Sequence, residues 1–174
     1  QLTSQGFVVA ANDWRRAAHK CADTIYARLT GNQPFSGAVS VEQGMLQVGN
    51  RTTLASLAGQ VTVANGAGLS GNGSVGSVVN HGVVASGGQT GNLGVTGNLA
   101  NAADGVLALT VSSPTATPLA VGGTATLGGA LQVNSLAPFT GNTTYSLITA
   151  GGGFNGTFSA ADLPQYAFLN TALV

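Results

Sequence analysis

The stretch that decides the fold is Pro118–Ala160, PLAVGGTATLGGALQVNSLAPFTGNTTYSLITAGGGFNGTFSA. Apolar residues take alternate positions from Thr124 to Val133, with a break at the pair Gly128-Gly129. A period of two is the pattern of a half-buried strand, and the glycine pair predicts a bend in that strand. A second β-rich segment, Thr144–Thr149, lies between glycine-rich turns. The stretch therefore predicts stacked β-structure.

The preceding part of the chain repeats this pattern in shorter units separated by glycine and asparagine. The predicted strands are Gln60–Val63, Gly68–Gly73, Ser77–Asn80, Gly82–Ala85 and Leu93–Thr96. Glycine and asparagine tolerate the positive φ angles of tight corners, and coils of roughly 20 residues are at the low end of repeat lengths. About seven coils, each rising ~4.8 Å, would fill residues 30–174. The pattern predicts an all-β, right-handed parallel β-helix; the alternative, a β-sandwich, favours longer alternating strands.

Composition limits the class of protein. The 174 residues fit one domain with a real core, and only 6% of them are charged, against roughly 25% in ordinary soluble domains. Although 44% of the residues are apolar, the 27 glycines leave no apolar run long enough to cross a bilayer as a helix. The net charge of zero gives no electrostatic reason to expect a nucleic-acid partner.

The N-terminal segment differs from the rest because it holds most of the charges. These are Asp13, Arg15, Arg16, Lys20, Asp23 and Arg28. Asn12 could cap a helix that reaches Leu29, but Thr24–Thr30 alternates as a strand does, so we favour a strand there and a short helix before it. The single cysteine, Cys21, excludes an internal disulfide and a cysteine-based metal cluster. Gln1 begins without a secretory signal pattern, so we expect a mature product or a fragment.

Five stretches of the sequence carry a resemblance to a known family. Residues 29–49 read LTGNQPFSGAVSVEQGMLQVG, an asparagine turn and an aromatic before a valine-rich strand and a Gly-x-Leu-x-Val strand. The others are AVGGTATLGGALQV (120–133), YSLITAGGG (145–153) and GTFSA (156–160), with LNTALV (169–174) closing the chain. Together they resemble the end of an autotransporter passenger, the secreted part of a type V secretion protein, with its passenger-associated repeat and autochaperone region.

The resemblance implies a function, a partner and a location. The expected function is that of a structural stem that supports folding and outer-membrane translocation and displays an upstream effector. The expected partner is a C-terminal membrane β-barrel of the same precursor, and the expected location is extracellular or at the bacterial cell surface. Two alternatives are the C-terminal part of a secreted serine protease or esterase, and a surface adhesin that binds a host surface or associates with itself.

Three regions are predicted within the chain. They are an N-terminal segment of uncertain structure (1–28), parallel β-helix coils (29–118) and a C-terminal capping unit (119–174). Pro114 and Pro118 bracket a loop before the last unit. Because six of the Phe and Tyr residues fall after residue 118, we expect the capping unit to be an aromatic core that hides open backbone edges. Its predicted structural residues are Leu127, Leu131, Val133, Tyr145, Leu147, Phe154 and Phe158.

No residue is predicted to be catalytic, to bind a cofactor or to ligate a metal. The two histidines, His19 and His81, lack a nucleophile motif, and His81 is expected to be a solvated turn residue. The acidic residues Asp13, Asp23, Glu42, Asp104 and Asp162 are expected to be scattered. The pattern G-x-G-x-x-G at Gly71–Gly76 is not followed by a helix signal, so it does not indicate a dinucleotide site. These residues are therefore expected to have no enzymatic activity.

Overall fold

The computed structural model describes residues 36–50, 52–88, 91–136 and 143–164. The chain divides into two units, Gln1–Pro34 and Phe35–Val174, and all the described residues belong to the second. None of the described segments forms a helix long and apolar enough to cross a membrane. The strands of the second unit form three sheets.

The strands are distributed over the three sheets in strict rotation. Sheet one contains β1 (Val39–Val41), β4 (Val61–Val63), β7 (Val78–Asn80), β10 (Leu99–Asn101), β13 (Ala125–Leu127) and β16 (Phe154–Gly156). Sheet two contains β2 (Gly44–Val48), β5 (Ala67–Gly71), β8 (Val83–Gly87), β11 (Val106–Val111), β14 (Ala130–Ser135) and β17 (Ala160–Asp162). Sheet three contains β3 (Ser56–Leu57), β6 (Ser74–Val75), β9 (Leu93–Val95), β12 (Leu119–Val121) and β15 (Ile148–Ala150).

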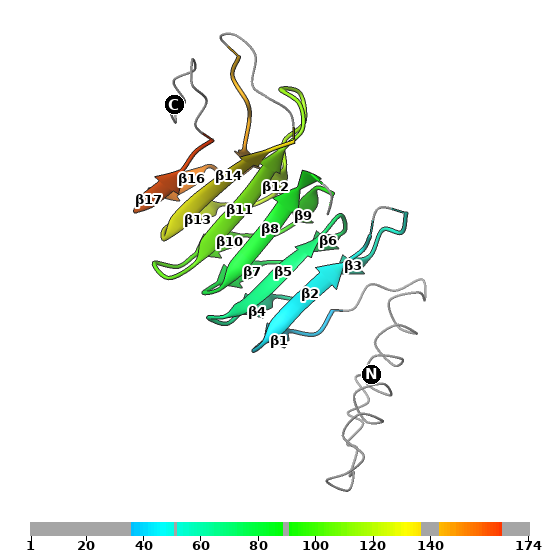
Figure 1. Ribbon diagram of the computed structural model, residues 1–174. Coiled ribbons are helices and arrows are strands. Elements are labelled where there is room, and N and C mark those ends of the chain that lie inside the picture. The colour runs from blue at the N-terminus through cyan, green and yellow to red at the C-terminus, as the bar shows by residue number, and fades with distance from the viewer. Residues whose placement is uncertain (1–35, 51, 89–90, 137–142, 165–174) are drawn as a thin grey trace, which may run out of the picture. The chain divides into compact units, whose positions relative to one another are not determined.

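The fold is a parallel β-helix, as the sequence predicts. Each strand pairs in parallel with the strand three places further along the chain, so that one strand from each sheet makes one coil. Figure 1 shows the coils stacked in chain order, from β1 and β2 to β16 and β17. Each coil contributes one strand to a sheet, so the two six-stranded sheets correspond to six coils. About seven coils were predicted for residues 30–174.

The core consists of aliphatic side chains stacked in register. In sheet one, Val61 lies beside Val78, which lies beside Leu99, and all three are buried. Sheet two stacks Leu107 on Leu131 in the same way, and sheet three stacks Leu93 on Leu119. Within the described residues the buried apolar side chains are all Val, Leu or Ala, so the core depends on many medium-sized contacts.

The C-terminal coil is more exposed than the sequence suggested. Phe154 continues the inward column above Ala125, but 51% of its surface is exposed because no further described strand covers it. All residues of β16 and β17 are exposed. Of the predicted structural residues, Leu131 and Val133 are buried, whereas Leu127, Tyr145, Leu147 and Phe158 are only partly covered. Three of the six aromatics expected there, Phe139, Tyr166 and Phe168, lie outside the described residues, and the core that the structure describes is aliphatic and lies in the middle coils.

Most predicted strands match the structure, and the exceptions lie near the ends. The second β-rich segment, Thr144–Thr149, contributes only the start of β15. The loop bracketed by Pro114 and Pro118 is present between β11 and β12. Sheets one, two and three continue past this loop, so the predicted boundary at 118/119 does not interrupt the stacking. The predicted N-terminal helix and the strand at Thr24–Thr30 lie outside the described residues.

Central coils should therefore contribute more to stability than the last coil. We expect Leu107→Ala, at a fully buried site, to lower the free energy of unfolding by about 2–5 kcal/mol. Phe154→Ala removes a larger side chain that is half exposed, so its effect should be smaller. Urea unfolding of both variants measures the difference. An equal or larger loss for Phe154→Ala would contradict this location of the core.

Candidate functional site

The corner between sheets one and two holds two of the four buried polar side chains that the structure describes, Asn80 and Asn101, together with His81 and Asp104. Here β7 ends at Asn80, and His81 and Gly82 lead into β8. One coil further on, β10 ends at Asn101, and a short turn containing Asp104 leads into β11. Asn80 and Asn101 are register partners, so the two corners begin at equivalent positions of neighbouring coils.

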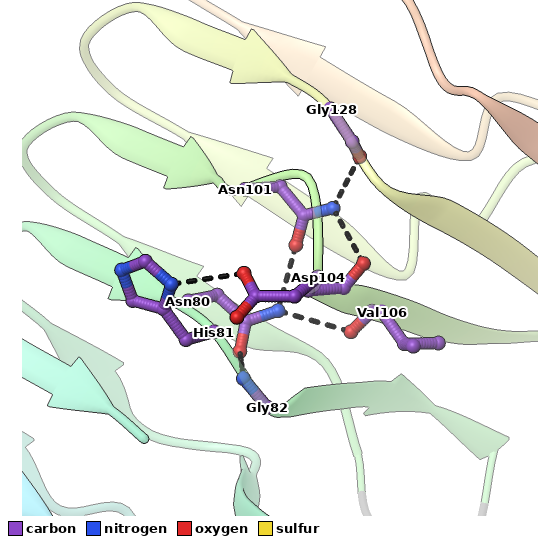
Figure 2. A network of polar contacts seen from close by, with 8 residues as sticks. Asn80, His81, Gly82, Asn101, Asp104, Val106 and Gly128 are labelled. Atoms are coloured by element: carbon purple, nitrogen blue, oxygen red, sulfur yellow. Dashed lines mark hydrogen bonds and ion pairs between the residues drawn. The ribbon is translucent and has the colours of Figure 1, made fainter. Parts of the chain in front are cut away.

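Two buried asparagines form a ladder across this corner. Asn80 is fully buried and Asn101 is 3% exposed, at positions where neighbouring coils carry apolar side chains. The Nδ2 of Asn80 donates to Oδ1 of Asn101 (2.6 Å) and to the carbonyl oxygen of Val106 (3.1 Å). Its Oδ1 accepts from the Gly82 N–H (3.1 Å). Figure 2 shows these contacts converging on the turn.

The second rung of the ladder reaches the next coil. Asn101 Nδ2 donates to the carbonyl oxygens of Gly105 (3.2 Å) and Gly128 (2.5 Å). Each side-chain amide thus has both of its donor hydrogens and its oxygen paired, which removes the cost of burying it. A Cβ atom on Gly105 would lie 2.4 Å from the Asn80 carbonyl oxygen, so only glycine fits beside the ladder.

On the outer side of the same corner, His81 and Asp104 form a hydrogen-bonded pair. The Nδ1 of His81 lies 2.9 Å from Oδ1 of Asp104, and the side chains are 45% and 48% exposed. An ionised carboxylate only accepts hydrogen bonds, so Nδ1 carries the proton. The hydrogen bond from His81 is the main cause that lowers the pKa of Asp104 below 3.8. Figure 2 shows the imidazole reaching the carboxylate from the preceding coil.

The pair has part of the geometry of a base and its orienting carboxylate. A hydrolase also needs a nucleophile within hydrogen-bond reach of the imidazole. Among the described residues, no hydroxyl or thiol is found hydrogen-bonded to His81. At half exposure, the pair is also open to screening by solvent and salt. It is therefore best explained as a link between two coils.

The other candidate sites do not assemble. In the G-x-G-x-x-G stretch, the Gly73 N–H donates to the Val48 carbonyl oxygen (2.9 Å) and the Ser74 N–H to the Ala55 carbonyl oxygen (2.9 Å), so the coils occupy the amides that a phosphate would need. The described residues contain no group of three or more His, Cys, Asp or Glu side chains suited to a metal ion. Glu42 accepts a hydrogen bond from Ser40, away from the His81–Asp104 pair.

Sequence reasoning missed the pairing of His81 with Asp104, because it treated His81 as a solvated turn residue and Asp104 as one of several scattered acidic residues. The signal was present in the spacing of their asparagines. The words Asn80-His81-Gly82 and Asn101-Ala-Ala-Asp104-Gly105 both run from an asparagine to a glycine. Once the two asparagines are aligned, the polar residues before each glycine come into reach of one another.

Comparisons with known proteins find curated relatives that match a short length of the chain. Curated relatives named Tol-Pal system protein TolB in Rhizorhabdus wittichii and Zymomonas mobilis are 66% and 60% identical to this chain over 35 residues. Tol-Pal system protein TolB 1 of Novosphingobium aromaticivorans is 69% identical over 35 residues. The match covers 20% of this chain and 8% of each of these relatives. No family model and no solved structure matches the chain.

These relatives overturn the resemblance to an autotransporter passenger. Their names belong to the Tol-Pal system, so the expected role as a passenger stem of type V secretion is wrong, and so are the protease, esterase and adhesin alternatives tied to it. The error has a physical cause. Alternating valine and leucine with glycine corners are what the coils of a parallel β-helix require, so those words report the fold and not a family.

The expected partner and location are corrected by the same finding. The membrane β-barrel of the same precursor, the host surface and self-association were inferred from the passenger resemblance, and the Tol-Pal names replace that basis. The expected extracellular or cell-surface location, reached by export through the outer membrane, is wrong for the same reason.

The asparagine ladder should be a specific source of stability. Asn101→Ala leaves the Gly105 and Gly128 carbonyl oxygens and one Asn80 donor without their partner, so we expect a loss of about 1–3 kcal/mol. Asn134→Ala, at an exposed position of β14, is the matched control and should stay within about 0.5 kcal/mol. Urea unfolding compares the two. The ladder has no such role if both variants unfold at the same urea concentration.

The His81–Asp104 pair should make stability depend on acid. Because its folded-state pKa is lowered, Asp104 contributes stability above the unfolded value of 3.8, and this contribution disappears as the pH falls through the folded-state pKa. His81→Ala should raise the pKa of Asp104, measured by carboxyl-carbon NMR titration, because it removes the main cause. His81→Asn, which keeps a donor, should restore part of the lowering. An unchanged pKa in His81→Ala would exclude the pair as the cause.

Proposed function

We propose that this chain is a non-catalytic component of the Tol-Pal system, with the β-helix as a rigid scaffold and the matched 35-residue stretch as its attachment. The observation that carries the proposal is 60–69% identity over 35 residues to proteins that all bear Tol-Pal names. Identity at this level over such a length favours a shared binding partner over chance.

The length of the match limits what is shared. It covers only 8% of each relative, so the relatives' whole activity does not transfer to this chain. A short shared stretch is better suited to recognising the same partner. Most of this chain is unmatched, and the six-stranded sheets of the β-helix require far more than 35 residues. The β-helix therefore needs a role of its own.

Rigidity is the property that the β-helix offers. Most of its inward positions are filled by stacked aliphatic side chains, and each central coil is bonded to both neighbours along three sheets. Close packing of this kind resists bending between adjacent repeats. A rigid β-helix of this kind is suited to hold the matched 35-residue stretch at a fixed distance from a partner that binds elsewhere on the β-helix.

The lack of catalysis is supported by the chemistry of the described residues. Their one histidine–carboxylate pair, His81–Asp104, is half exposed and links two coils. The buried polar side chains Asn80, Asn101 and Ser86 are all engaged in hydrogen bonds to neighbouring coils. These groups are used for structure, which leaves none of them poised for proton transfer or nucleophilic attack.

A competition experiment tests the proposal. Purified full-length chain is added to TolB 1 of Novosphingobium aromaticivorans that is bound to the other Tol-Pal proteins of that organism. We expect the chain to displace TolB 1 in a saturable way, because both would use the shared stretch. Peptide, ester and glycoside substrates should be hydrolysed no faster than in buffer.

The double variant His81→Ala, Asp104→Asn is the control for this experiment. It should compete as well as the original chain, because the pair lies in the scaffold. Failure of the chain to displace TolB 1 at concentrations far above that of TolB 1 would refute the attachment. Hydrolysis that the double variant abolishes would refute the lack of catalysis.

A further inference from the structure

Three asparagines of the chain are followed directly by glycine, and the fold treats them differently. They are Asn65, Asn72 and Asn155. An Asn-Gly pair is prone to spontaneous deamidation because glycine has no side chain to hinder attack by its own backbone nitrogen. The reaction requires that the backbone nitrogen be free to approach the side-chain amide.

The reaction needs only water. The backbone nitrogen of the glycine loses its proton and attacks Cγ of the asparagine, a carbon–nitrogen bond forms, and ammonia leaves. Water then opens the resulting five-membered imide at either carbonyl group and gives aspartate or isoaspartate. Base speeds the first step because it removes the amide proton.

Asn65 is followed by a backbone nitrogen with the freedom that this reaction requires. It lies exposed in the turn between β4 and β5, followed by the exposed Gly66. Gly66 has φ +82°, a conformation natural to glycine, and there is open space where a Cβ atom would stand. Within the described part of the chain, no hydrogen bond holds the Gly66 N–H. The attacking nitrogen is therefore neither bonded nor crowded.

The other two pairs are restrained by neighbouring coils. The Gly73 N–H donates to the Val48 carbonyl oxygen (2.9 Å), and a Cβ on Gly91 would lie 2.3 Å from Cβ of Asn72, so both reacting groups of Asn72-Gly73 are held. Asn155 and Gly156 lie in β16, which is paired with β13. A Cβ on Gly156 would lie 2.5 Å from the Leu127 carbonyl oxygen, which shows how closely the neighbouring strand approaches.

We propose that Asn65 is a site of spontaneous deamidation that converts the neutral turn beside the His81–Asp104 pair into an acidic one. The side-chain amide of Asn65 is the smallest of the influences that lower the pKa of Asp104, so it lies near that carboxylate. Deamidation replaces that donor with a second carboxylate, so attraction becomes repulsion between like charges. The formal net charge of the chain changes from zero to minus one, and the new charge lies at the corner where Asp104 already stands.

The test is to age the full-length chain in mildly alkaline buffer and follow its mass. Fragmentation of the intact protein locates each gain of one mass unit. We expect Asn65 to be modified at least about tenfold faster than Asn72 or Asn155, which can react only after local opening of the coils. In concentrated urea, where no coil is folded, the three sites should react at similar rates.

Two variants complete the experiment. Asn65→Gln keeps an amide but needs a less favourable six-membered ring, so the rapid mass gain should vanish, whereas Asn72→Gln should leave it unchanged. Asn65→Asp imitates one product and should raise the pKa of Asp104 above that in Asn65→Gln. The proposal is overturned if Asn72 or Asn155 reacts first in the folded chain, or if Asn65 stays unmodified while the urea-unfolded chain reacts at all three sites.

Discussion

Stacking of like side chains in register, coil upon coil, is the constraint on which this structure depends. Parallel strands lie about 4.8 Å apart, so each inward side chain touches the residue at the same position one coil away. Apolar columns such as Leu93 on Leu119 satisfy the constraint through area removed from water. A polar side chain satisfies it only if its neighbour supplies matching donors and acceptors. Asn80 and Asn101 do so, because the amide nitrogen of Asn80 donates to the amide oxygen of Asn101.

The same constraint explains where the coils differ in length. A residue inserted within a strand would turn every later side chain to the other face. Insertions are therefore confined to corners: His81 and Gly82 alone connect β7 to β8, whereas β11 and β12 are separated by the loop that contains Pro114 and Pro118. Of the acidic residues that the structure describes, Glu42 and Asp104 lie at corners and Asp162 ends β17. The His81–Asp104 pair and the Asn65 turn also lie at corners.

Period-two alternation was enough to predict the parallel β-helix and most of its strands, because the inward side chains of each strand occupy alternate positions in the sequence. Leu131 and Val133 were predicted as core residues and are buried. Phe154 was also expected to be core, and it does occupy an inward register position, yet it is half exposed. Alternation shows which way a side chain points, but burial also depends on whether another coil lies above it. The His81–Asp104 pair was missed because its partners are joined by coil stacking, whose register no single segment of sequence defines.

The failed family assignment shows which parts of such a chain carry information about ancestry. A β-helix coil admits few residue types at its inward positions and corners, so unrelated chains arrive at similar glycine, valine and asparagine words. Because the fold itself demands these residue types, such stretches predict the fold well but give poor evidence of common ancestry. Identity of 60–69% over 35 residues is different, because it requires agreement at most positions of a continuous stretch and not only at alternate ones. For this chain, the architecture is read from the repeating pattern, and the system it serves is inferred from the short stretch shared with the Tol-Pal proteins.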